Sequence, residues 1–138
     1  MTHQNVISAL IATSLLAVLA ACAGMPSSSA PVKFSGGTLV NTAGMTLYSY
    51  DRDTGGKSAC SGACAAIWPP LKAAAEDKGG GDFSIIARDD GSRQWAYDGK
   101  PLYLWSKDAK PGDKTGDGFN KVWHVVGQPE IPANLGGY

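Results

Sequence analysis

The sequence predicts a mainly β fold, a compact pseudo-twofold sheet or sandwich with one or two short helices. Three observations lead to this fold class. The 138 residues include 18 glycines and 8 prolines, a composition that favours many turns over long helices. Strand-like runs flank an Asp-Gly pair, which is typical of a β-hairpin. A segment of about 34 residues recurs at an offset of 55 residues, so two similar halves are expected.

The internal repeat spans about residues 38–71 and again about residues 93–126. Residues 44–50 (GMTLYSY) align with residues 99–105 (GKPLYLW) without a gap. Identical residues stand at equivalent positions in the two copies: Gly44 and Gly99, Leu47 and Leu102, Tyr48 and Tyr103, Asp53 and Asp108, and Trp68 and Trp123. Agreement at so many positions in one register indicates duplication.

Each copy is expected to begin with a β-hairpin. In the second copy, residues 94–97 and 101–105 flank Asp98-Gly99, which supplies the positive φ angles of a tight turn. The first copy turns at residues 42–44. The remaining expected elements are a strand at 83–87, a turn at 89–91, a closing strand at 121–126, and short helices around 63–67 and 71–77.

The amino terminus predicts a lipoprotein signal peptide of residues 1–21. Residues 6–21 form an uncharged apolar run, shorter than the roughly 20 residues that span a bilayer but suited to a secretory signal. The sequence Leu19-Ala20-Ala21-Cys22 resembles the lipobox of bacterial lipoproteins, in which the cysteine sulfur receives diacylglycerol and the chain is cut just before it. This resemblance implies that Cys22 is lipidated. The alternatives are an ordinary cleaved signal or a buried apolar helix.

A lipid on Cys22 would anchor the protein to a membrane of the cell envelope, on the periplasmic face. Residue 23 is Ala rather than the Asp that retains lipoproteins in the inner membrane of enterobacterial relatives, so the outer membrane is the preferred location. Residues 22–35 are expected to form the lipidated cysteine and a flexible tether, since residues 23–31 read AGMPSSSAP. Residues 36–138 are expected to form the repeat domain.

The charges and the remaining cysteines exclude some classes of function. Twelve basic and twelve acidic residues balance, so the sequence gives no electrostatic reason to expect nucleic acid as a partner. Besides Cys22, only Cys60 and Cys64 are present. An even pair in an oxidising compartment is expected to form a disulfide, which here would close a small loop and stiffen one turn.

The repeated motif points to a family. Residues Tyr48-x-Tyr50-x-x-Asp53 and Tyr103-x-Trp105-x-x-Asp108 resemble the Y-x-[FWY]-x-x-D motif of predicted secreted bacterial lipoproteins, known as a secreted repeat of unknown function. Residues 60–70 (CSGACAAIWPP) and 89–97 (DDGSRQWAY) also resemble that group. The resemblance covers essentially the whole mature domain. It implies a lipoprotein with a repeat architecture and carries no reaction.

Two interpretations of the motif stand side by side. On a strand, Tyr48 and Tyr50 point to one face, and so do Tyr103 and Trp105. The motif is either a core aromatic pair with a capping aspartate, or an aromatic platform for a ligand or glycan. The core interpretation is favoured, because a structural need recurs in each copy while a single active site would not.

Metal binding is an alternative at two places, although no cofactor is expected. Copper would need Cys60, Cys64 and His124 together, because two thiolates commonly join a His or Met in copper sites. Weak calcium binding in the loop at 108–120 is the second alternative. Four residues there occupy positions 1, 3, 5 and 6 of a calcium-loop template: Asp113, Thr115, Asp117 and Gly118. Position 12 is His124 instead of Glu.

No catalytic constellation is found in the sequence, because the mature chain has a single histidine and nothing brings two carboxylates together. The predicted function is a membrane-anchored envelope lipoprotein, a non-catalytic binding or structural module whose protein or small-molecule partner is unknown. The alternative is a periplasmic copper-binding or thiol-redox protein that uses the C-x3-C pair. A hydrolase of wall or glycan is the more distant option.

Overall fold

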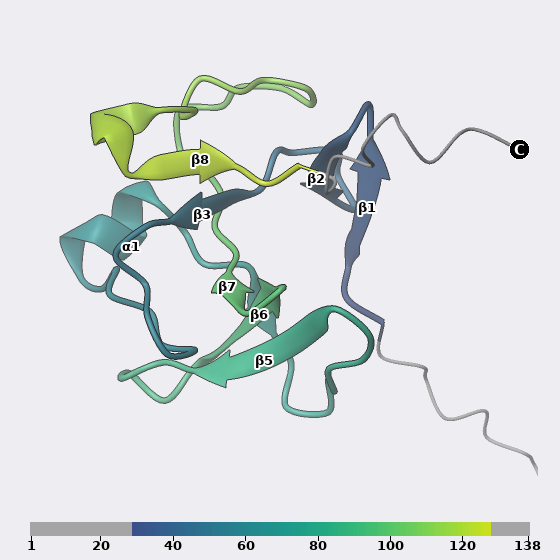
Figure 1. Ribbon diagram of the computed structural model, residues 1–138, viewed down its shortest axis with the longest axis vertical. Helices are drawn as coiled ribbons and strands as arrows, with labels where there is room; N and C mark the ends of the chain where they lie inside the picture. The colour runs from purple at the N-terminus through teal and green to yellow at the C-terminus, as the bar shows by residue number, and fades with distance from the viewer. Residues whose placement is uncertain (1–28, 128–138) are drawn as a thin grey trace, which may run out of the picture.

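The computed structural model in Figure 1 describes residues 29–127. The predicted signal peptide 1–21, the lipidation site Cys22 and residues 23–28 of the tether lie outside the described residues. Within residues 29–127, no helix has both the length and the apolarity needed to cross a bilayer.

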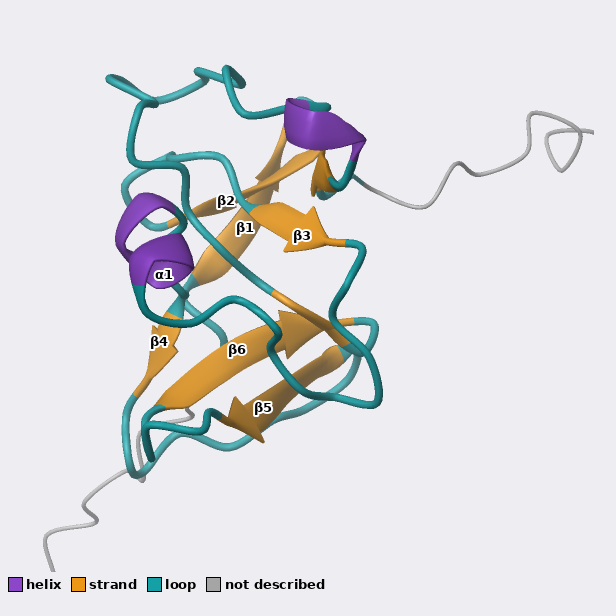
Figure 2. Ribbon diagram, turned by 90° about the vertical axis from the view of Figure 1, so that its left-hand side faces the viewer, coloured by secondary structure: helices purple, strands orange, loops and turns teal. Residues whose placement is uncertain are grey.

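The described residues form short strands with little helix, as Figure 2 shows. In chain order the elements are β1 (Val32–Ser35), β2 (Thr38–Asn41), β3 (Tyr48–Tyr50), α1 (Ala63–Ile67), β4 (Lys72–Ala73), β5 (Phe83–Ala87), β6 (Arg93–Tyr97), β7 (Lys100–Pro101), the 3-10 turn η1 (Phe119–Lys121) and β8 (Trp123–Val125). They build three antiparallel sheets: β1 with β2, β3 with β8, and β4-β6-β5 with β7 also on β6. The mainly β prediction is confirmed.

Local turn chemistry explains the hairpins around β6. Between β6 and β7, Asp98 and Gly99 have φ angles of 48° and 74°, a backbone region that Gly adopts freely and Asp tolerates. Between β5 and β6, the Arg88 amide donates to the Ser92 carbonyl at 2.8 Å, and Gly91 has a φ of 82°. Both turns lie where the sequence predicts them.

One of the two expected helices is present. Helix α1 covers the predicted residues 63–67, but the helix predicted at 71–77 is wrong. That segment starts with β4, which pairs with β6. The Arg93 guanidinium then donates to the carbonyls of Ala75 at 2.7 Å and Asp77 at 2.9 Å. These carbonyls are therefore bound by a side chain from another strand, and not by helical amides.

Two boundaries also differ from the predicted ones. The tether predicted to reach residue 35 ends before Val32, because β1 pairs along its whole length with β2. The closing strand predicted to begin at residue 121 begins at Trp123. Asn120 and Lys121 have φ angles of 50° and 59°, which bend the chain out of the extended conformation just before the strand.

The two copies of the repeat exchange their C-terminal segments. Strand β8 belongs to the second copy but pairs with β3 of the first (Figure 1). The equivalent segment of the first copy pairs with the second, where Leu104 N donates to Pro69 O at 2.7 Å and Leu71 N donates to Leu102 O at 2.9 Å. Neither copy therefore completes its own sheet.

The pseudo-twofold axis passes between Tyr48 and Tyr103. Their backbones exchange two hydrogen bonds, with Tyr48 N to Tyr103 O at 2.8 Å and Tyr103 N to Tyr48 O at 3.0 Å. On one side of this pair lies a core of aliphatic residues around Trp95 that includes the equivalent residues Leu47 and Leu102, both fully buried. On the other side lies a cluster of buried aromatic rings. Both copies contribute to each cluster, so burial of apolar surface joins the halves.

Candidate functional site

The first tyrosine of each motif is buried and bonds to the aspartate of the other motif. The Tyr48 hydroxyl donates to Asp108 Oδ2 at 2.7 Å, and the Tyr103 hydroxyl donates to Asp53 Oδ2 at 2.6 Å. Neither tyrosine is exposed to solvent. The two motifs are therefore completed by each other across the axis, in line with the exchanged strands.

Each aspartate also fixes the loop that follows it. Asp53 Oδ1 accepts a bond from Ala59 N at 2.7 Å, and Asp108 Oδ1 accepts one from Thr115 N at 3.0 Å. Burial raises the pKa of both Tyr48 and Tyr103, and the bond to a carboxylate raises it further. Burial also raises the pKa of Asp53, although its bonds oppose this change. The tyrosines are thus held protonated as donors.

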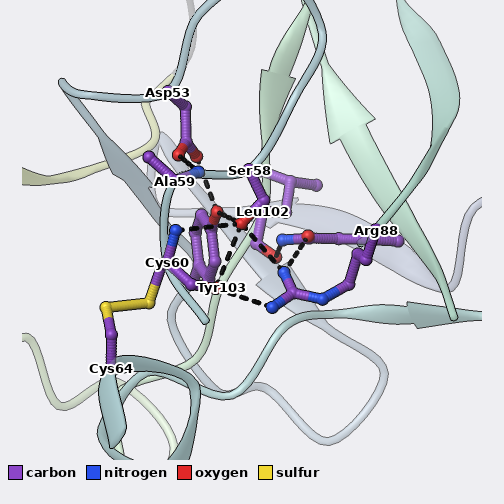
Figure 3. The surroundings of a disulfide bond; sticks show 9 residues. Asp53, Ser58, Ala59, Cys60, Cys64, Arg88, Leu102 and Tyr103 are labelled. Carbon is purple, nitrogen blue, oxygen red and sulfur yellow. Dashed lines mark hydrogen bonds between the residues drawn. A yellow bond between two sulfur atoms is a disulfide. The ribbon is translucent and has the colours of Figure 1, made fainter. Parts of the chain in front are cut away.

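The predicted disulfide between Cys60 and Cys64 is confirmed, with an S–S distance of 2.04 Å (Figure 3). The buried Arg88 holds its loop, since Nη2 donates to Cys60 O at 2.6 Å and Nη1 donates to Ser58 Oγ at 3.0 Å. Ser58 shares a further hydrogen bond of 2.7 Å with the Tyr103 hydroxyl. The disulfide loop is therefore connected to the Tyr103–Asp53 pair.

In the structure, the two cysteines that copper would need as thiolates are oxidised to a disulfide. Cys60 and Cys64 are joined to each other, and His124 Nε2 lies 2.8 Å from Asp51 Oδ2 on the surface. Among residues 29–127, no group of three His, Cys, Asp or Glu side chains is arranged to hold a metal ion. Copper binding stays a prediction, and it would require reduction of the disulfide first.

The side chains of the calcium template bind their own backbone. Asp113 Oδ2 accepts bonds from Ala109 N at 2.9 Å and Lys110 N at 3.1 Å, and these bonds lower the pKa of Asp113. Asp117 Oδ1 accepts a bond from Val125 N at 3.0 Å. Calcium binding also stays a prediction, and it would compete with these amides.

The second aromatic residue of each motif lines a surface cleft of about 380 Å³. Four rings form a continuous stack along it. The centroid distances are 4.2 Å from Tyr50 to Trp123, 3.8 Å from Trp123 to Trp68, and 4.0 Å from Trp68 to Trp105. Phe119 packs beside the stack, 5.0 Å from the Trp105 ring. We call this site the aromatic cleft. Its volume lies at the lower end of the range for small-molecule sites, roughly 300–1,000 Å³.

The aromatic cleft is built from both copies of the repeat. Five pairs of its lining residues are equivalent at the offset of 55: Tyr50 and Trp105, Arg52 and Lys107, Cys64 and Phe119, Ile67 and Val122, and Trp68 and Trp123. Each of the three stacking contacts joins a ring of one copy to a ring of the other. The cleft therefore lies on the pseudo-twofold axis.

The rim of the aromatic cleft leaves apolar surface exposed. Among the described residues, three large hydrophobic side chains are exposed, and two of them line this cleft: Ile67 at 45 % and Phe119 at 39 %. Two exposed cations, Arg52 and Lys107, complete the rim, and Lys107 Nζ lies 5.7 Å from the Trp105 ring centroid. Exposed apolar side chains gathered at a cleft are typical of a binding site.

The sequence alone did not identify the aromatic cleft. It marked Trp68 and Trp123 only as repeat positions and did not single out Arg52 or Lys107. A usable signal was present, because the aromatic residue at 50 and its equivalent at 105 are each followed two positions later by a cation, Arg52 and Lys107. The core interpretation describes the buried residues Tyr48, Tyr103 and Trp105, whereas Tyr50 is only partly buried and lines the cleft.

The comparisons with known proteins agree with the repeat architecture. The model of a family described as a secreted repeat of unknown function matches residues 33–72 and 84–127, which together are well over half of the chain. The two matched segments correspond to the two copies of the repeat. Neither a curated protein nor a solved structure matches the chain.

Proposed function

The chain belongs to this family of secreted repeats, and from that premise we propose that it is a lipid-anchored, non-catalytic binding module of the cell envelope. Its ligand site is the aromatic cleft. The single observation that supports this assignment is the gathering of equivalent residues from both copies around one apolar hollow. A purely structural repeat has no need to leave Ile67 and Phe119 exposed there.

The anchor rests on the sequence before the described residues. An apolar signal of residues 6–21 ends in Leu19-Ala20-Ala21, directly before Cys22. The first strand, β1, begins at Val32, so about ten residues separate the lipid from the folded part. The composition of residues 23–31 predicts a flexible tether, for which the scaling of flexible linkers gives a span of roughly 15–20 Å.

The anchor is tested by replacing its acceptor. Mass spectrometry of the protein made in a Gram-negative host should find a diacylglyceryl-modified Cys22 as the first residue. The variant Cys22→Ala should lack the lipid, and density-gradient fractionation should no longer find a mature form in the membrane. Cys60→Ser and Cys64→Ser are the matched controls and should keep the lipid. An unmodified Cys22 in the wild-type protein would contradict the proposal.

Ligand binding at the cleft is tested with a neutral aromatic probe, naphthalene dimethanol, in calorimetric titrations. Phe119→Ala removes apolar contact area at the rim and should weaken binding about fivefold or more. Phe34→Ala is the matched control, because Phe34 is the third exposed large hydrophobic residue and does not line the cleft. Tryptophan emission should change on binding, since Trp68, Trp105 and Trp123 line the cleft. Equal weakening by both variants would place binding elsewhere.

A further inference from the structure

We propose that the aromatic cleft selects a small, flat, apolar molecule that carries an anionic group, carboxylate or phosphate, at each of its two ends. This inference rests on the proposed function and specifies its ligand class. It is argued from the charges at the rim, from the way the rings cover one another, and from the volume of the cleft.

The rim carries two cations at pseudo-twofold positions. Arg52 of the first copy is equivalent to Lys107 of the second, and no Asp or Glu lines the cleft. Within residues 29–127 no ion pair joins either cation to a carboxylate, whereas Lys110 and His124 both lie within ion-pair distance of one. Two cations without an ion-pair partner at the rim of one apolar cleft favour anionic groups on a ligand there.

The chemistry of the two cations suits acidic groups. Arginine binds carboxylate and phosphate through a planar, bidentate fork, and lysine binds them as a point charge. Because Arg52 and Lys107 are related by the pseudo-twofold axis, they approach the cleft from its two halves. A ligand that satisfies both must carry charge at two separated points, with an apolar body between them over the rings.

The stacking of the rings points in the same direction. Trp68 is stacked between Trp123 at 3.8 Å and Trp105 at 4.0 Å, and two rings this close can only lie on opposite faces. Trp123 is covered in the same way by Trp68 and Tyr50. Both central tryptophans are therefore almost fully buried, at 3 % exposure each, and only ring edges, which carry the positive end of the quadrupole, can reach the cleft. Edges favour electron-rich ligand atoms, whereas a sugar that stacks on tryptophan needs an open ring face.

The size of the cleft limits the ligand to a small molecule. A volume of about 380 Å³ holds a molecule of one or two fused rings and is small for a polymer segment. The ligand class is thus a compact dianion with an aromatic or similarly flat apolar body.

The test uses three probes of one shape on the full chain, measured by calorimetric titration. Naphthalene dicarboxylate carries two charges at opposite ends, naphthoate carries one, and naphthalene dimethanol carries none. Each exposed charge pair raises the affinity a few-fold at most. With two such pairs, the dianion should bind about tenfold tighter than the neutral probe. Arg52→Ala combined with Lys107→Ala should remove this difference. Lys33→Ala combined with Lys72→Ala changes the net charge equally outside the cleft and should preserve it.

The possible outcomes separate this inference from the proposed function. A dianion preference that is lost in the rim variant and weakened by added salt supports the inference. Equal binding of all three probes, still weakened by Phe119→Ala, overturns the dianion preference and leaves the binding site in place. Equal binding of naphthoate and the dicarboxylate overturns the two-ended ligand. Absence of binding by every probe overturns both proposals.

Discussion

The loops that follow the two motifs are closed by different interactions. The loop after Asp53 is closed by the Cys60–Cys64 disulfide, whereas the loop after Asp108 has Thr115 and Phe119 at the equivalent positions. Thr115 binds Asp108 through both its amide and its hydroxyl, at 3.0 and 2.6 Å. A covalent link in one copy is thus matched by hydrogen bonds in the other.

What stays the same in both loops is the contact across the axis. Each aspartate accepts the hydroxyl of the opposite tyrosine, and both pairs are present whatever closes the loop. The two copies differ at the cleft, where Cys64 of the first copy and its equivalent Phe119 of the second copy are both lining residues. The contacts across the axis are thus the same in both copies, whereas the loops differ in sequence. This difference makes the two ends of the cleft unequal.

The strongest test of the comparison is to remove each aspartate. Asp108→Ala leaves the Tyr48 hydroxyl and the Thr115 amide without an acceptor and should lower the free energy of unfolding by about 4 kcal/mol. Asp53→Ala should cost less, about 2 kcal/mol, because Ser58 still binds Tyr103 and the disulfide still closes the loop. Urea denaturation measures both values. A larger loss for Asp53→Ala would reverse the assignment of the weaker loop.

Alkaline pH should lower the free energy of unfolding through one tyrosine in each half of the protein. The pKa of Tyr48 and of Tyr103 is raised above the ordinary value of 10.0, so the folded state keeps protons that the unfolded chain releases. Stability is therefore fully present below pH 10 and falls as pH rises, by about 1.4 kcal/mol per pH unit for each tyrosine. Urea denaturation between about pH 9 and about pH 11 measures the slope. Tyr48→Phe and Tyr103→Phe should each remove half of it, and an unchanged slope would contradict this origin.

Removal of the disulfide should destabilise only moderately. Cys60→Ser combined with Cys64→Ser opens a loop with a sequence separation of 4, for which the chain-entropy model gives about 2 kcal/mol. Thermal and urea denaturation measure this loss, and reduction of the wild-type protein should reproduce it. Complete unfolding would mean that the first loop cannot rely on its hydrogen bonds as the second one does.

The smallest loss of stability is expected from the addition of a single methyl group next to the stacked rings of the cleft. A Cβ at Gly116 would lie 2.7 Å from Trp68 Cη2 and 3.0 Å from Trp105 Cγ, so Gly116→Ala must displace the stack. The expected loss is about 1–2 kcal/mol, with a changed near-ultraviolet dichroism spectrum. Gly80→Ala is the matched control, since its Cβ would meet no atom within 4 Å. An unchanged spectrum for Gly116→Ala would show that the stack has room to move.

Local signals were enough to predict many elements of the fold. The turn at Asp98-Gly99, the strand at 83–87 and the helix at 63–67 are each specified by residues within a few positions of one another. The exchange of segments was not predictable in this way. An offset of 55 states which residues are equivalent, but equivalent strands can pair within a copy or between copies. The failed helix at 71–77 has the same cause, because a partner distant in sequence holds that segment.

The site was predictable only in part, for a related reason. The disulfide was predicted from the pair of cysteines that remains besides Cys22 and from the secreted location that the amino terminus predicts. The aromatic cleft depends on which rings become neighbours, and each stacking contact joins the two copies. Tyr50 lies 4.2 Å from Trp123 only because β8 crosses to β3. The equivalent cations at 52 and 107 were the one signal of the rim available in advance.

The exchange of strands also determines the order in which a secreted chain can complete its fold. A polypeptide that crosses a membrane amino end first delivers β3 long before its partner β8 arrives. Cys60 and Cys64 are only 4 positions apart and can be oxidised while the first half waits. The first half is therefore incomplete during export until β8 pairs with β3, and its disulfide can form before that pairing.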